Sequence, residues 1–294
     1  MPADTLLAAF PWNDRRGRFS PLRAVVLAGL IAPAVWILLE WHLGWLGPRV
    51  LNEAIHQTGE WTVRFLLLAL AVTPLRHATG WTRLIGIRRL TGLAALFYVL
   101  AHFSLYCVDQ RLDILRIASE IVLRIYLTIG FTALLGLVAL GATSTDGMIR
   151  RLGGLRWRRL HSIVHAIAVL AMLHFFMQSK IDTYEATLML GVLLILEGCR
   201  LIVWRGFRLA PAALALNAVV AAALTALLEA GWYGLATRVP ASAVFAANLE
   251  LDDLTMLRPA WWVLVAGLGL AVLAWGIAAV RNRRRPQRML AAKA

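Results

Sequence analysis

Four histidines of this 294-residue chain lie within long apolar stretches, where an ionisable side chain is costly and usually has a function. They are His102, His161, His165 and His174. An imidazole in such a stretch can ligate a heme iron, or it can form a hydrogen bond between helices. The other three, which fall in predicted loops or at helix ends and are expected to be solvated, are His42, His56 and His77.

Two of these histidines are predicted to lie at the same depth. His102 follows Arg89 by 13 residues and His174 follows Arg159 by 15 residues, and both arginines mark the basic ends of their helices. At about 1.5 Å per residue, each imidazole lies roughly 20 Å from that end. Two imidazoles at matching depth on two helices can ligate one heme iron from both sides.

A second iron is predicted at the basic level, because His161 comes only two residues after Arg159. On an ideal helix His161 and His174 would be about 140° apart, so two hemes would occupy different gaps between helices, or the helix is distorted. The second ligand at this level stays open. His77 and His165 are candidates, and a five-coordinate heme is the alternative.

The helices that carry these histidines are predicted to form a bundle that crosses the membrane several times. The chain is 60% hydrophobic with a mean hydropathy of +0.71, and the apolar residues form runs long enough to span a bilayer. We predict an all-α transmembrane bundle of about eight spans, the second of them ending at Thr73–Pro74. The predicted spans are 22–40, 61–75, 89–107, 126–143, 160–177, 184–203, 211–230 and 260–280.

The charge of +14 is distributed unevenly between the two predicted faces. With the N-terminus inside, 22 of the 30 Lys and Arg residues lie on the inner face, and 12 of the 16 acids lie outside. This positive-inside pattern predicts cytoplasmic termini and a multi-pass protein of a bacterial inner membrane. The basic residues then face anionic lipid, so nucleic acid is not needed as a partner.

Residues 1–14 lack the basic start of a signal peptide, and the first apolar run is expected to remain as a span.

The two cysteines, Cys107 and Cys199, are predicted at opposite faces, where they match neither a disulfide nor a metal site.

Several motifs in one order between about residues 58 and 205 resemble a known family. They are Gly59-Glu60-Trp61, LAVTPLR at 70–76, RRLTGL at 88–93, TSTDGMIRRLG at 143–153, WRRLH at 157–161 and Leu173-His174. The chain resembles the MsrQ (YedZ) family, the heme-binding membrane subunits of the periplasmic methionine sulfoxide reductase system, within the ferric-reductase-like transmembrane group.

The resemblance implies that His102, His161 and His174 are axial ligands of one or two b-type hemes. It also implies a periplasmic molybdopterin methionine sulfoxide reductase as catalytic partner, the quinol pool as electron source, and FMN as an additional cofactor. Sulfoxide reduction itself would not occur on this chain. His165 departs from the family pattern, because an aromatic residue, usually Tyr, is expected there.

The resemblance divides the chain into a cytoplasmic tail at 1–21, a six-helix heme-binding core at 22–205 and a two-helix extension with a basic tail at 206–294. Near the basic ends of the core, Arg88, Arg89 and Arg159 could pair with heme propionates or act as positive-inside anchors.

No Gly-rich dinucleotide fingerprint follows a predicted strand, so electrons are expected from quinol or from a separate flavin reductase. One alternative function is a cytochrome b subunit of another periplasmic oxidoreductase. A multi-pass transporter is a weaker alternative, because the acids lie at the ends of the predicted spans and not near mid-bilayer.

Overall fold

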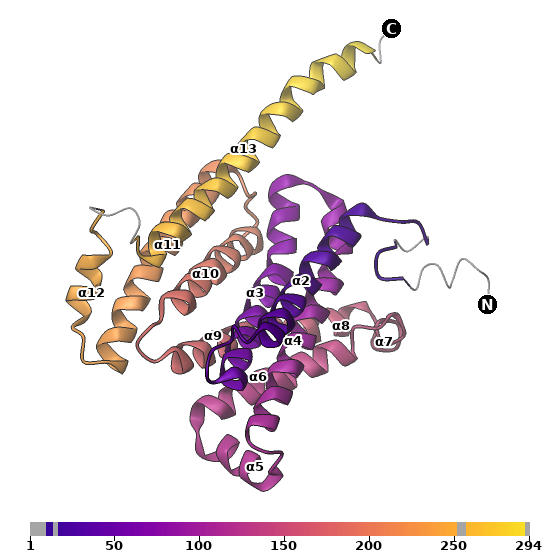
Figure 1. Ribbon diagram of the computed structural model, residues 1–294. Helices are drawn as coiled ribbons and strands as arrows, with labels where there is room; N and C mark the ends of the chain where they lie inside the picture. The colour runs from indigo at the N-terminus through magenta and orange to yellow at the C-terminus, as the bar shows by residue number, and fades with distance from the viewer. Residues whose placement is uncertain (1–9, 14–16, 252–256, 292–294) are drawn as a thin grey trace. The chain divides into compact units, whose positions relative to one another are not determined.

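The computed structural model describes residues 10–13, 17–251 and 257–291, and for 282–291 it describes the backbone alone (Figure 1). The described chain is helical, which confirms the all-α prediction. The helices are α2 (Pro21–Leu43), α3 (Val50–Thr79), η1 (Thr82–Gly86), α4 (Arg88–Asp109), α5 (Ile114–Leu123), α6 (Ile125–Ala142), α7 (Asp146–Leu152), α8 (Gly154–His161), α9 (Val164–Ser179), α10 (Tyr184–Trp204), α11 (Pro211–Ala236), α12 (Ala241–Ala247) and α13 (Pro259–Ala291).

Seven helical segments among the described residues are long and apolar enough to cross a membrane. They are Pro21–Leu43, Thr82–Asp109, Ile125–Ala142, Gly154–Ser179, Tyr184–Trp204, Pro211–Ala236 and Pro259–Arg281. Helix α3 is not among them, since Arg64 and Arg76 lie in or beside its apolar stretch. An eighth span through α3 stays a prediction, and so does the cytoplasmic side of both termini.

The predicted end of the second span was wrong. Helix α3 does not stop at Pro74 but continues to Thr79, because a proline inside an apolar helix removes only one backbone hydrogen bond. The predicted fifth span lies within the segment Gly154–Ser179, and this helix is distorted at Ser162 and Ile163, where the Ile163 amide bonds the Leu160 carbonyl three residues back. A tighter turn therefore separates His161 from the rest of this span.

The chain forms two compact units, which we describe separately. Unit 1 contains residues 1–72 and 83–178, and unit 2 contains residues 73–82 and 179–294. The predicted sixth span therefore groups with the C-terminal helices. The role of 206–294 as an extension to a six-helix core stays a prediction.

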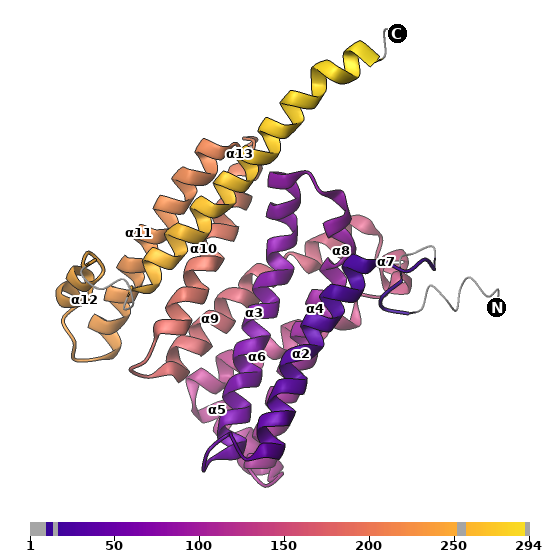
Figure 2. The same ribbon diagram turned by 45° about the horizontal axis from the view of Figure 1, so that its top comes forward.

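Within unit 1, the short helices α5 and α7–α8 lie at opposite ends of α6 (Figure 2). Asp113 is the N-cap of helix α5, and its carboxylate accepts a hydrogen bond from the Arg116 backbone amide. Ile117 is buried, whereas Leu115 and Val122 are exposed. Helix α5 therefore packs the side that carries Ile117 on the rest of unit 1 and leaves other apolar side chains exposed.

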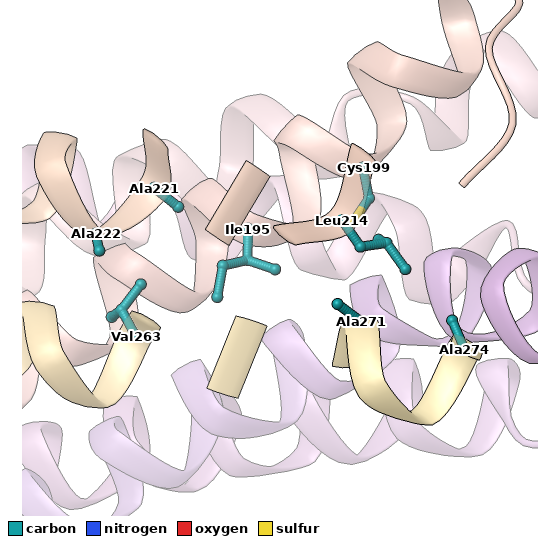
Figure 3. Packing of buried hydrophobic residues seen from close by; sticks show 8 residues of the cluster. All are labelled: Ile195, Cys199, Leu214, Ala221, Ala222, Val263, Ala271 and Ala274. Atoms are coloured by element: carbon teal, nitrogen blue, oxygen red, sulfur yellow. The ribbon is translucent and has the colours of Figure 1, made fainter. Parts of the chain in front are cut away.

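Unit 2 is built around the close packing of α10, α11 and α13 (Figure 3). Small residues allow this approach: a Cβ added at Gly267 would lie 2.5 Å from the Cβ of Ala218 and 3.0 Å from its Cα. Small residues let the backbones of membrane helices approach closely, and dispersion contacts then stabilise the bundle. The side chains of this core are Ile195, Cys199, Leu214, Ala221, Ala222, Val263, Ala271 and Ala274.

The buried carboxylate of Glu229 on α11 bonds the segments that follow α11 in unit 2. The Glu229 side chain is 1% exposed and accepts hydrogen bonds of 2.8 Å from both Arg258 and Asn248. A buried charge is tolerated only when it is paired in this way. This contact ties α12 and the residues that precede α13 to α11, a feature that the sequence analysis did not predict.

Replacing Gly267 by Leu is expected to destabilise unit 2, because the new side chain has no room against the Ala218 backbone. Overpacking of this kind costs about 1–3 kcal/mol. The measurement is the loss of monodisperse protein on heating in detergent. Gly269→Leu is the matched control, since nothing lies within 4 Å of a Cβ at Gly269. Equal thermal stability of the two variants would show that this helix contact is not tight.

Candidate functional site

His102 of α4 and His174 of α9 face each other inside unit 1. Their ring centroids are 6.3 Å apart and their planes make an angle of 85°. An imidazole nitrogen lies about 2 Å from a first-row metal ion that it binds, which places the metal roughly 3 Å from the ring centroid. Two imidazoles on opposite sides of one iron therefore have centroids about 6 Å apart, and this pair has that spacing.

The Nδ1 atoms of both rings are engaged by the backbone. His102 Nδ1 lies 2.8 Å from the Ile55 carbonyl oxygen, and His174 Nδ1 lies 2.8 Å from the Tyr126 carbonyl oxygen. A carbonyl only accepts, so each Nδ1 carries the proton and donates it. Each neutral ring then has its lone pair on Nε2, the tautomer that a metal ion binds.

A glycine makes each of these contacts possible. Gly59 comes four residues after Ile55 on α3, and Gly130 comes four residues after Tyr126 on α6. A Cβ at Gly59 would lie 3.0 Å from His102 Nδ1, and one at Gly130 would lie 2.7 Å from His174 Nδ1. Side chains of a helix lean toward its N-terminus, so a larger residue there would cover the carbonyl four residues earlier. The same carbonyl–glycine–histidine arrangement thus occurs twice.

The two rings lie on the wall of a cavity of about 380 Å³ lined by α3, α4, α5, α6 and α9. Its apolar lining includes Val63, Val99, Leu134 and Leu137. Its polar lining comes from the start of α3, the end of α4, and α5 with its C-cap Arg124. An apolar chamber with two opposed imidazoles and one polar end fits a porphyrin, which has an apolar macrocycle and carboxylates at one edge.

His161 lies outside this group, and its ring is held differently. Its Nε2 is 3.1 Å from the Thr143 hydroxyl, and Trp157 stacks on the ring at 4.0 Å. The Thr143 hydroxyl donates to the Ala139 carbonyl at 2.8 Å, so it accepts from Nε2. His161 therefore has its proton on Nε2, the opposite tautomer to that of His102 and His174.

The remaining predicted residues do not join the cavity lining among the residues that the structure describes. His165 is half-buried on α9, and His77 lies in unit 2, where Arg76 is 2.9 Å from its Nε2. Arg89 forms an exposed ion pair of 2.8 Å with Asp146. Arg88 and Arg159, like Arg89, are exposed at the end of unit 1 that carries His161.

The sequence analysis missed the residues that orient the two rings. Backbone carbonyls carry no sequence signature, so the roles of Ile55 and Tyr126 could not be read from residue types. Gly59 and Gly130 did carry a signal, since each lies in the interior of a helix, where glycine is unfavourable unless another group approaches closely.

Comparisons with known proteins identify the family of this chain. The family model of the ferric reductase like transmembrane component matches residues 58–172. The protein-methionine-sulfoxide reductase heme-binding subunit MsrQ of Rhodospirillum rubrum is 42% identical over 191 residues, which cover 65% of this chain and 89% of the relative.

Two further relatives carry the same name. The subunit of Xanthomonas campestris pv. campestris (strain 8004) is 43% identical over 63% of this chain and 84% of the relative. The subunit of Ralstonia nicotianae is 42% identical over 55% of this chain and 76% of the relative. No solved structure matches the chain. Because such identity extends over most of each relative's length, the chain belongs to the MsrQ family of protein-methionine-sulfoxide reductase heme-binding subunits.

Proposed function

We propose that this chain is a membrane b-type cytochrome that carries electrons to a methionine sulfoxide reductase for the repair of oxidised proteins. The proposal rests on one observation above all. His102 and His174 oppose each other at the spacing of two axial ligands, and both Nδ1 atoms donate to backbone carbonyls. The names of the relatives, which describe heme-binding subunits of this system, support it.

The residues of unit 1 would hold a b-type heme between His102 and His174, and a bound heme supplies a one-electron carrier. The two carbonyls fix the tautomer and the orientation of each imidazole, and a hydrogen bond to Nδ1 makes the ring a stronger donor. The apolar lining excludes water, and low polarity around an iron raises the energy of its more highly charged state. The chain thus determines the axial ligands of the iron and the polarity of its surroundings.

The finer parts of the proposal concern location and partners. The chain would reside in a bacterial inner membrane, with its basic face toward the cytoplasm, as the charge distribution predicts. Quinol would deliver electrons near that face, with FMN as an additional cofactor. A periplasmic molybdopterin methionine sulfoxide reductase would receive them at the opposite face. Family membership supports these assignments, and a cytochrome b subunit of another oxidoreductase is the remaining alternative.

We further propose His161 as a ligand of a second heme. The hydrogen bond that now engages its Nε2 has a net value of about 1 kcal/mol, which is small beside a metal–imidazole bond. Release of Thr143 would free this nitrogen. His165 and His77 stay candidates for the opposite ligand, and Arg88, Arg89 and Arg159 stay candidates for propionate contacts.

Replacing His102 or His174 by Ala is expected to abolish the spectrum of the bis-imidazole heme, because the iron loses an axial ligand. The measurement is a reduced-minus-oxidised visible spectrum with pyridine hemochrome quantitation of purified protein. Oxidation of the reduced protein by a methionine sulfoxide reductase with its substrate tests electron delivery. His42→Ala is the control, since His42 is exposed on α2. Unchanged heme content in H102A and H174A would refute the ligand assignment.

Gly130→Val is expected to weaken heme retention although both ligands remain. Its side chain would meet the His174 ring, because a Cβ alone comes within 2.7 Å of Nδ1. Displacing a packed group costs about 1–3 kcal/mol, which corresponds to roughly a five- to hundredfold loss of affinity. The rate of heme transfer to apomyoglobin measures it. Gly29→Val is the control, with nothing within 4 Å of its Cβ. Equal rates would contradict the role of this glycine.

His161→Ala is expected to reduce the heme-to-protein ratio from about two to about one and to leave the His102–His174 spectrum intact. The ratio is obtained from pyridine hemochrome and amino-acid analysis of the same sample. Thr143→Val serves as the comparison, because it removes the hydrogen bond at Nε2 and keeps the imidazole. If H161A has the same heme-to-protein ratio as the wild type, His161 does not bind a heme.

A further inference from the structure

The cavity that contains His102 and His174 has two chemically different ends. Toward α5 it is lined by polar residues that include Asn52, Asp109 and Gln110, whereas the lining elsewhere is mostly apolar. A heme carries two carboxylates at one edge of an apolar ring, and a buried carboxylate without a partner is strongly disfavoured. If the proposed heme occupies this cavity, its carboxylate edge must face the polar end.

That end has two arginines among the described residues that line the cavity, and one is already engaged. Arg124 forms an ion pair with Glu120, and its guanidinium lies 3.2 Å from the Tyr126 hydroxyl. The other carboxylates of this lining are also bonded: Glu60 pairs with Arg64 at 3.0 Å, and Asp109 accepts from Gln110 at 2.9 Å. These groups leave little capacity for a new anion.

The second arginine, Arg116, has its guanidinium available. Its backbone amide bonds Asp113 at the start of α5, but no described residue bonds or pairs with its guanidinium. Arg116 lines the cavity together with Glu120, one turn further along the same helix. Ile117, buried beside it, anchors this face of α5. The buried Ile117 therefore anchors the helix, and the exposed guanidinium of Arg116 stays available at the polar end of the cavity.

We propose that Arg116 binds a propionate of the heme and so fixes the orientation of the porphyrin, with its carboxylate edge toward α5. This inference rests on the proposed function. A guanidinium binds a carboxylate through two parallel hydrogen bonds, and this charge-assisted pairing is stronger than any contact that a neutral amide of the same lining can make. Helix α5 thus acts as part of the cofactor site.

The test compares full-length Arg116→Gln, Arg116→Lys and Arg111→Gln proteins, each purified with its heme. Arg111 is an exposed arginine of the preceding turn that does not line the cavity. R116Q is expected to transfer heme to apomyoglobin about tenfold faster than wild type, the effect of one lost charge-assisted hydrogen bond. Its midpoint potential is expected to fall, because removal of a nearby positive charge favours the oxidised iron. R116K should restore most of the potential.

Equal transfer rates and potentials for R116Q and R111Q would overturn the inference. If R116Q retains no heme at all, R116K decides: heme bound at the wild-type potential supports charge pairing, whereas loss of heme from both variants contradicts it. A wild-type chain that binds no heme would instead overturn the proposed function, so the two failures are distinguishable.

Discussion

The hydrogen bonds from two imidazoles to two backbone carbonyls are the constraint on which the rest of unit 1 depends. A helix carbonyl already accepts the amide four residues later, and the side chain of that later residue normally covers it. The chain has glycine there in both cases, at Gly59 for Ile55 and at Gly130 for Tyr126. Helices α3 and α6 must then lie close to α4 and α9, so the geometry of four helices follows from two contacts.

Much of this arrangement could be predicted from residue types and spacing. Apolar length located several of the long helices to within a few residues, for example α6 at Ile125–Ala142 against an expected 126–143, but α3 begins at Val50 and not near 61, because its first turns are polar. Depth from the flanking arginines correctly brought His102 and His174 together. Pro74 and the Ser162–Ile163 turn were harder, since whether a helix continues through such a residue depends on the groups packed around it. The pairing of Glu229 with Arg258 joins residues far apart in sequence, and no local pattern reports it.

The two units differ in how closely their helices pack. Unit 2 packs small residues so tightly that an added methyl group at Gly267 would meet a backbone atom, and the carboxylate of its ion pair is buried. Unit 1 leaves a cavity of about 380 Å³ between its helices. An unfilled apolar cavity sacrifices dispersion contacts along its walls. A ligand that fills it would restore those contacts, and stability and cofactor binding would then be linked by mass action.

His102 and His174 are ready to bind a metal ion and His161 is not, because their imidazole rings donate hydrogen bonds to different kinds of group. At His102 and His174 the partner is a carbonyl, which cannot give up a proton, so the tautomer is fixed and Nε2 is free. At His161 the partner is a hydroxyl, which rotates and can exchange the roles of donor and acceptor. The ring there also lies just before the turn that separates α8 from α9. The first level is organised in advance for a metal, whereas the second can bind one only after a local rearrangement. Two sites built in this way would differ in affinity, and the tighter one would fill first.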